Sequence, residues 1–246
     1  MKMLSYSRAQ WYVDLMDPMA EALNQLDVDR FNELRARALA IISTEEMDRD
    51  MADAIDIVVS YLGFLRHVAF RENGEAERDY PQARERLLRR THGPESDLTR
   101  RRYYLQLRII ADNMKLEPLQ INEFRSLFSD LDFHEMHTEQ WYFASNFAFR
   151  HKDLETISRA YEQFLLYRDE HDNELFQWVR LSVMYRLLRQ EVQPRHIEKL
   201  LLSIRTSANA REVRSLLLPE IERQQLMTPE LEALLERTQD QLDMSR

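Results

Sequence analysis

Three bulky aromatic residues, Tyr104, Trp141 and Trp178, recur along the chain at a fixed interval of 37 residues. Each begins a stretch in which apolar residues have helical spacing, and a second stretch of this kind follows each one. A period of about 20 to 50 residues is typical of stacked helical repeats, in which each unit buries its apolar face against the next. The period therefore predicts recurring helix pairs and favours a scaffold that binds another macromolecule.

The composition favours an all-α fold. The 246 residues include only 3 glycines and 7 prolines, and Arg, Glu, Leu and Ala, all good helix formers, are abundant. The main β-branched run, Ile57 to Val59, lies inside a longer helical pattern. From the start and stop signals we expect about twelve helices with short connections. We expect antiparallel helix pairs stacked into an α-solenoid.

Charge and cysteine content narrow the classes of function. The formal net charge is −9, so bulk attraction to nucleic acid or to an anionic membrane is not expected. The chain contains no cysteine, which excludes disulfides and thiolate catalysis. We expect no signal peptide before Asp17 and no membrane span, because the most apolar stretch, Ala54 to Phe70, carries charged residues. A cytoplasmic protein is the resulting expectation.

A His-Gly-Pro sequence offers the best candidate for a boundary inside the chain. It separates a divergent helical part, residues 1–92, formed by helix pairs or a small bundle, from residues 93–246, which we assign to repeats and C-terminal capping helices. One continuous domain is the alternative. The long apolar helix expected from Ser43 or Thr44 to Phe70 should be buried, and a homodimer seam is the alternative for its apolar face.

Prolines mark further helix boundaries. We expect Pro18 to begin a helix capped by Asp17, and Pro81 to open a short helix that ends near Arg90. Pro118 should lie in the first turn of a helix, and Pro219 should kink the helix that contains it.

The segment from Trp141 to Leu165 holds the best-defined repeat unit. Small residues follow the tryptophan at Ala144, Ser145 and Ala148, a turn lies at Lys152-Asp153, and the second helix carries Ile157, Tyr161, Phe164 and Leu165. This pattern resembles the tetratricopeptide repeat. The neighbouring units match in part, so the resemblance covers about residues 98–205. Arg108 replaces a small residue in the first unit, which predicts a wider separation between the two helices there.

The resemblance implies a concave groove, lined by the first helix of each pair, that binds an extended or helical peptide. The implied partner-binding positions are Arg102, Tyr142, Asn146, Phe149, Arg150 and Arg186. Asn146 would form a hydrogen bond with the backbone of the peptide. Tyr142 stands where some members of the family carry a lysine that clamps a terminal carboxylate. The order of a helical part followed by repeats is also similar to that of bacterial regulators.

Motifs for catalysis and cofactor binding are absent from the sequence. The isolated glycines exclude a phosphate-binding loop, and neither a nucleophile elbow nor a zinc-protease motif occurs. We therefore expect no enzymatic activity and no cofactor. The segment from Asp130 to His137 contains two histidines and three carboxylates. Because it lies on a predicted loop, we favour solvated polar residues over a metal site.

A basic region from Arg84 to Arg102 contains seven arginines, among which we single out Arg84, Arg89, Arg90, Arg100 and Arg101. Carboxylates interleave with them, as on an ordinary charged helix surface. The leading hypothesis is a non-enzymatic adaptor or co-chaperone that binds a protein or peptide, without a membrane or nucleic-acid partner. The alternative is a regulatory protein that contacts nucleic acid or an acidic partner through this region.

Overall fold

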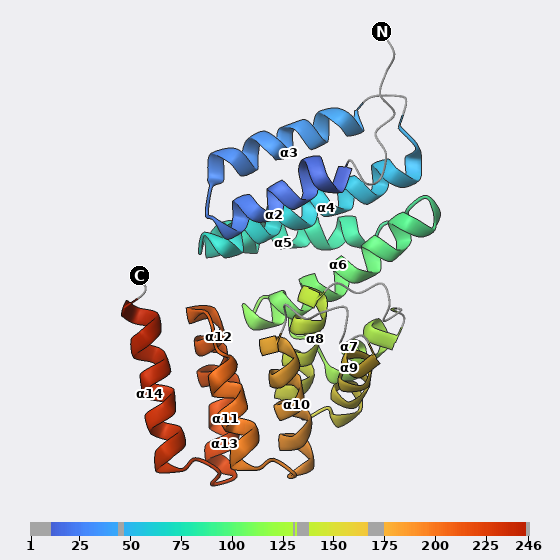
Figure 1. Ribbon diagram of the computed structural model, residues 1–246. Helices are drawn as coiled ribbons and strands as arrows, with labels where there is room; N and C mark the ends of the chain where they lie inside the picture. Colours follow the sequence, from blue (N-terminus) through green and yellow to red (C-terminus); the bar gives the residue numbers. More distant parts are fainter. Residues whose placement is uncertain (1–10, 44–46, 130, 132–137, 167–174, 245–246) are drawn as a thin grey trace. The chain divides into compact units, whose positions relative to one another are not determined.

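The computed structural model describes residues 11–43, 47–129, 131, 138–166 and 175–244 (Figure 1). Within these ranges every regular element is a helix, so the all-α prediction is confirmed. The chain forms two compact units, Met1–Glu135 and Met136–Arg246, and is not divided near residue 92. The reason is that the helix after the His-Gly-Pro sequence packs on the two helices that precede it.

The first unit contains η1 (Tyr12–Met16), α2 (Asp17–Asn24), α3 (Val28–Ile42), α4 (Arg49–Ala69), α5 (Asn73–Leu88), α6 (Gly93–Asn113) and α7 (Ile121–Ser129). Helix α4 is its centre and contacts α2, α3, α5 and α6. Ile55, Val59 and Phe64 on α4 are buried, so the expected burial of this helix is confirmed. The apolar face considered as a dimer seam is covered by helices of the same unit.

The second unit contains α8 (Thr138–Arg150), α9 (Leu154–Leu166), α10 (Leu175–Arg189), α11 (Pro194–Ser203), α12 (Ser207–Glu212), η5 (Val213–Leu217), α13 (Leu218–Arg223) and α14 (Pro229–Met244). Consecutive helices from α8 to α11 contact one another, and α14 packs on α11 and α12 (Figure 1). None of the helices in the described ranges combines the length and the apolar character needed to cross a bilayer.

The aromatic residues that define the 37-residue period have different environments. Tyr104 in α6 and Trp141 in α8 are buried, as expected for residues that fill the space between packed helices. Trp178 in α10 is only half-buried. Its ring stacks on Tyr161 of α9, with 5.5 Å between the ring centroids, and Tyr161 stacks in turn on Tyr185. Trp178 therefore joins α9 and α10 at the edge of the core.

A single type of turn ends α2, α4, α6, α8, α10 and α13. The residue after the C-cap has a left-handed backbone, with φ between 55° and 62°, at Leu26, Arg71, Lys115, Lys152, Gln190 and Gln225. After α8, for example, the amide of Lys152 donates to the carbonyl of Phe149 (3.0 Å) and the amide of Asp153 to that of Ala148 (2.8 Å). These two bonds define a Schellman motif.

The six turns lie 35 to 45 residues apart along the chain. The left-handed conformation favours glycine, but none of the six residues that adopt it here is a glycine. The second helix of each of the first five pairs contacts the first one. Helix pairs therefore occur in residues 1–92 as well, where the sequence shows no aromatic period. The turn escapes detection in the sequence because its usual glycine is missing.

The prolines act differently from the predictions at several positions. Pro18 and Pro219 each follow a π-helical turn, η1 and η5, inside a continuous helical path. A π-turn accommodates the missing amide hydrogen and the bulk of the ring, so the distortion expected at Pro219 is present. Asp17 is not an N-cap, because the chain is already helical at Met16. The predicted helix start at Pro81 is wrong, since Pro81 lies inside α5.

The beginning of α4 also differs from the prediction. The helix starts at Arg49, where the side chain of Asp48 accepts a hydrogen bond from the amide of Asp50. The sequence prediction placed the start at Ser43 or Thr44, but Ser43 is the C-cap of α3. Residues 44–46 lie outside the described ranges.

Candidate functional site

Two of the predicted groove residues form an internal cluster around Arg180, a residue of α10. The guanidinium of Arg180 lies over the ring of Tyr142, 4.8 Å from its centroid, and donates to the side-chain oxygen of Asn146. It also donates to the Ser145 hydroxyl (2.9 Å) and to Glu212 Oε1 of α12 (2.9 Å). We call Arg180, Tyr142, Ser145, Asn146 and Glu212 the Arg180 cluster.

Burial controls the electrostatics of the Arg180 cluster. Burial lowers the pKa of Arg180, and the charge of Glu212 opposes this shift. The pKa of Tyr142 rises to about 12, first because the phenol is buried and then because Glu212 lies close to it. The cluster therefore holds an ion pair and a neutral phenol inside the second unit. The side-chain oxygen of Asn146 therefore already accepts one hydrogen bond, from Arg180, inside the second unit.

The other predicted groove positions are also distributed differently from the expectation. Phe149 is only 1% exposed and belongs to the core, so it offers no surface to a ligand. Arg150 is exposed, and its Nε donates to the backbone carbonyl of Asn146 over 3.4 Å. Arg186 on α10 is half-buried, and so is Arg102 on α6 of the first unit. Among these four positions, Arg150 is the exposed one.

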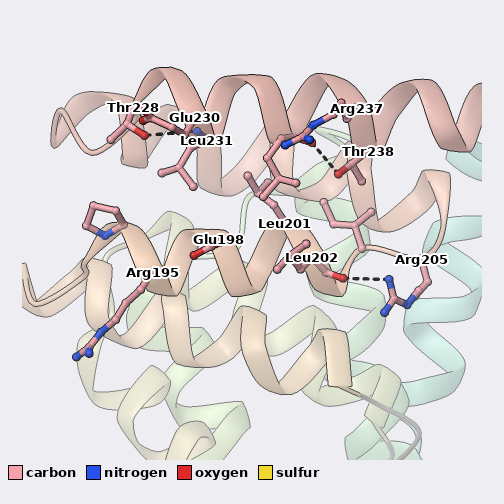
Figure 2. Close-up of a pocket in the computed structure, with 13 residues that line it drawn as sticks. Arg195, Glu198, Leu201, Leu202, Arg205, Thr228, Glu230, Leu231, Arg237 and Thr238 are labelled. Atoms are coloured by element: carbon pink, nitrogen blue, oxygen red, sulfur yellow. Dashed lines mark hydrogen bonds between the residues drawn. The ribbon is translucent and has the colours of Figure 1, made fainter.

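A groove that the sequence analysis did not identify lies between α11 and α14 (Figure 2). It has a volume of about 610 Å³. Its lining residues are Pro194, Arg195, Glu198, Leu201, Leu202, Ile204, Arg205, Thr228, Glu230, Leu231, Leu234, Arg237 and Thr238. Leu201 and Leu231 are buried, whereas Leu202 is 53% exposed. The groove therefore combines an apolar base with an exposed leucine and a charged rim.

A signal for this groove is present in the sequence. Leu200, Leu201 and Leu202 are consecutive in α11, and three successive positions of a helix span more than one face. Leu200 and Leu201 are buried, which leaves Leu202 directed towards solvent at the groove. An uninterrupted leucine triplet on a surface helix could thus have indicated a binding surface.

The predicted basic region consists mostly of arginines that are paired with carboxylates. Arg84 lies 3.1 Å from Glu117, and Arg89 lies 3.1 Å from Glu85. Asp97 pairs with both Arg100 (2.7 Å) and Arg101 (2.8 Å), and the hydrogen bond from Arg100 lowers the pKa of Asp97. Arg90 is exposed. This internal neutralisation weakens the case for nucleic acid at this surface.

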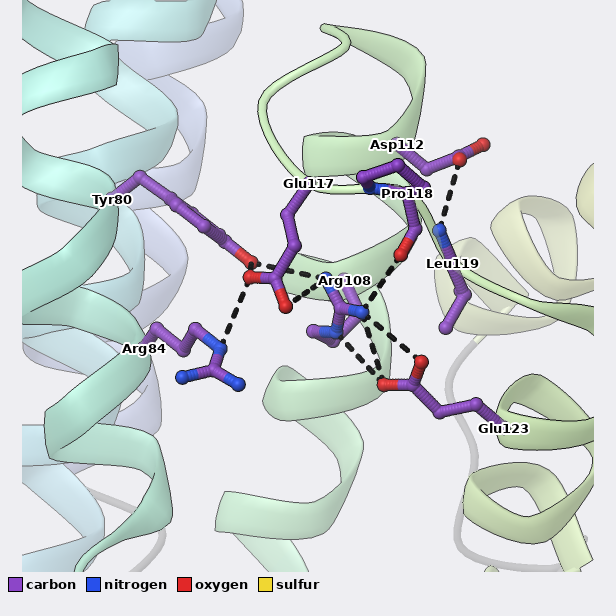
Figure 3. Close-up of polar contacts among 8 residues, drawn as sticks. All are labelled: Tyr80, Arg84, Arg108, Asp112, Glu117, Pro118, Leu119 and Glu123. Atoms are coloured by element: carbon purple, nitrogen blue, oxygen red, sulfur yellow. Dashed lines mark hydrogen bonds and ion pairs between the residues drawn. The ribbon is translucent and has the colours of Figure 1, made fainter.

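Arg108 explains how a large residue fits where the repeat pattern has a small one (Figure 3). Its side chain is 2% exposed, and its guanidinium donates to Glu123 of α7 over distances of 3.0 to 3.2 Å. It also donates to the hydroxyl of Tyr80 in α5 and to the carbonyl of Pro118, both at 3.1 Å. Although burial opposes it, the hydrogen bonds that Arg108 donates to Tyr80 and Glu123 raise the pKa of Arg108.

The same network moves the start of α7. Pro118, predicted in the first helical turn, lies before Ile121, the first residue of α7. The carbonyl of Pro118 is engaged by Arg108, and the amide of Leu119 donates to Asp112 Oδ1 over 3.0 Å. Glu117 accepts from Tyr80 (2.6 Å), and burial together with this bond raises the pKa of Tyr80 to about 12. The Arg108 network therefore ties α5, α6 and α7 together.

The metal site that the sequence analysis weighed against solvated polar residues falls on a segment that the structure mostly does not describe. Apart from Leu131, the segment Asp130 to His137 lies outside the described ranges. In the part of the chain that is described, the side chains form no group of three histidine or carboxylate ligands suited to a metal ion.

Comparison of this chain with protein-family models, with curated protein sequences and with solved structures finds no match. The resemblance to the tetratricopeptide repeat accordingly depends on the residues and spacings given above.

Proposed function

We propose that this chain is a non-enzymatic scaffold, an adaptor or a co-chaperone, which binds a segment of another protein between α11 and α14. The carrying observation is the groove of about 610 Å³ in which Leu202 is exposed next to buried leucines. An open apolar groove with a polar rim is the type of surface that accepts a partner helix or peptide. The recurring Schellman turns support the repeat character of the chain, and repeat proteins typically bind partners on extended surfaces.

The proposal places the binding surface away from the positions that the repeat resemblance implies. In α8, Tyr142 and Asn146 contact Arg180, and Phe149 is buried. By contrast, Leu202 is available for contact with a partner. The groove between α11 and α14, which are the second helices of two successive pairs, therefore has more support as a binding surface than the face formed by the first helices.

An affinity capture with the full chain tests this proposal. The decisive variant is Leu202→Glu, and the matched control is Leu88→Glu on α5, because the two leucines are 53% and 47% exposed. We expect a protein partner, identified by mass spectrometry, to be retained by the wild type and by Leu88→Glu and to be lost by Leu202→Glu. Equal retention by both variants would exclude the groove as the binding site, provided that their circular dichroism matches the wild type.

A further inference from the structure

The helices α11 and α14 run in the same direction along the groove (Figure 2). Pro194 and Thr228 lie at the starts of α11 and α14. Towards the other end of the groove, Arg205 follows the last residue of α11 and Arg237 lies in the middle of α14. The carbonyl ends of both helix dipoles therefore point towards the end that carries these two arginines. Glu198 and Glu230 lie nearer to the amino ends of the helices. The groove thus has a basic end and an acidic end.

The two arginines at the basic end are available to an external anion. Arg205 Nη1 donates to the carbonyl of Leu202 (3.0 Å), and Arg237 Nε donates to the carbonyl of Ala233 (3.2 Å). Among the residues that the structure describes, neither guanidinium pairs with a carboxylate. Both side chains are exposed. Arg195 differs, since its side chain points away from α14 in Figure 2.

The shape of the groove favours a helix as the occupant. Its walls are the side chains of two helices, whose backbone hydrogen bonds are satisfied internally, so an extended peptide finds no strand edge to pair with. The apolar base formed by Leu201 and Leu231, together with the exposed Leu202, suits leucine-type side chains at positions i, i+3, i+4 and i+7 of a ligand helix.

From these observations we infer that the groove binds an amphipathic helix of a partner protein whose first turn is acidic. This inference rests on the proposed function. The ligand helix runs antiparallel to α11 and α14, so that its amino end meets Arg205 and Arg237. In this orientation the dipole of the ligand helix is antiparallel to those of α11 and α14. Carboxylates in its first turn stabilise the amino end of the ligand helix and can form ion pairs with the two arginines. The reverse orientation would bring the acidic turn to Glu198 and Glu230.

Fluorescence polarisation with labelled synthetic peptides tests the inference on the full chain. The probe peptide has leucines at the helical spacing given above and two glutamates in its first turn. One control peptide has lysines in place of the glutamates, and another has the glutamate pair in its last turn. Because an exposed ion pair contributes only modestly, we expect the probe to bind about tenfold more tightly than either control. Added salt should reduce this difference.

Charge reversal supplies the matched variants. The double substitution Arg205→Glu and Arg237→Glu should weaken binding of the probe about tenfold and favour the lysine peptide. The control double substitution, Arg37→Glu on α3 and Arg214→Glu on η5, changes the net charge equally at exposed arginines that do not line the groove and should leave probe binding unchanged.

Two results would overturn the inference and would be distinguishable from failure of the proposed function. If all three peptides bind alike and Leu202→Glu abolishes their binding, the groove binds helices without regard to charge, and only the acidic inference falls. If no peptide binds, the inference also falls, and the Leu202→Glu capture experiment alone decides whether the groove has a protein partner.

Discussion

Arg180 Nη1 lies 2.9 Å from Glu212 Oε1, and the two side chains are only 3% and 7% exposed. This buried ion pair joins α10 to α12, and Tyr142 and Asn146 of α8 complete its surroundings. Three helices of the second unit therefore depend on one guanidinium. A charge buried at this depth is tolerated only when it is paired, so removal of one partner has a large cost.

Substitution of Glu212 by alanine should lower the free energy of unfolding by about 3–5 kcal/mol, because it leaves Arg180 as an unpaired buried charge. Urea denaturation followed by circular dichroism measures this change. The double variant Arg180→Met and Glu212→Met is the control and should lose less stability than Glu212→Ala alone, since both charges are removed. A loss below about 1 kcal/mol in Glu212→Ala would contradict the burial of the pair.

Stability should fall in acid because of Glu220. Hydrogen bonds from Arg223, Lys152 and Gln224, with that from Arg223 the largest contribution, lower the pKa of this carboxyl to about 2, against an ordinary value of 4.5. A carboxyl with a lowered pKa in the folded state stabilises the fold above its unfolded pKa. This contribution should be complete above pH 4.5 and lost as the pH falls towards about 2.

The variant Glu220→Gln isolates this effect. The wild type should lose about 1–3 kcal/mol more stability than the variant between neutral pH and about pH 2. Denaturant unfolding at successive pH values gives the comparison. Parallel acid profiles for the two proteins would rule out Glu220 as the source.

Gly93 at the start of α6 should not tolerate a side chain. Its φ is +80°, and a methyl group there would lie 2.5 Å from the carboxylate carbon of Asp50. Asp50 also accepts a hydrogen bond from the amide of Ser96 (2.9 Å), so its position is constrained. Gly93→Ala should therefore destabilise the protein by about 1–3 kcal/mol in thermal or chemical denaturation.

Gly74→Ala provides the matched control for Gly93→Ala. Gly74 lies in α5 with no neighbouring atom within 4 Å of the added methyl group. The substitution should be neutral or stabilising by up to about 1 kcal/mol, because alanine favours a helix. Equal effects of the two substitutions would contradict both the backbone strain expected at the positive φ of Gly93 and the close contact with Asp50.

The left-handed turn after α10 should be improved by glycine. Gln190 has φ of 60° and is exposed, so Gln190→Gly relieves backbone strain without removing a buried contact. We expect a gain of about 1 kcal/mol in the free energy of unfolding. Gln190→Ala retains the Cβ atom and should give no comparable gain. A loss of stability in Gln190→Gly would contradict the Schellman geometry.

Several features could be predicted from local sequence because they depend on local properties. A composition rich in helix-forming residues predicted the all-α class, and the 37-residue period predicted buried aromatics at Tyr104 and Trp141. The helix start at Arg49 could not be predicted in this way. Ser43, Thr44 and Asp48 are all suitable capping residues, and the choice among them depends on where α3 ends.

The contacts of the candidate site could be predicted even less from local sequence. The position of Asn146 on α8 is compatible with a peptide groove, but Arg180, which is distant in the sequence, engages its side-chain oxygen. Similarly, nothing in the leucine triplet of α11 specifies that Leu202 is the exposed member.

The sequence by itself therefore determined the helical class, the pairing of α8 with α9 and of α10 with α11, and the identity of much of the core. Only the tertiary structure decided which polar groups are used in internal contacts and which apolar side chains stay exposed. The physical reason is that helix propensity and side-chain volume act over neighbouring residues, whereas an ion pair such as Arg180–Glu212 and a groove such as that between α11 and α14 arise from packing between distant helices.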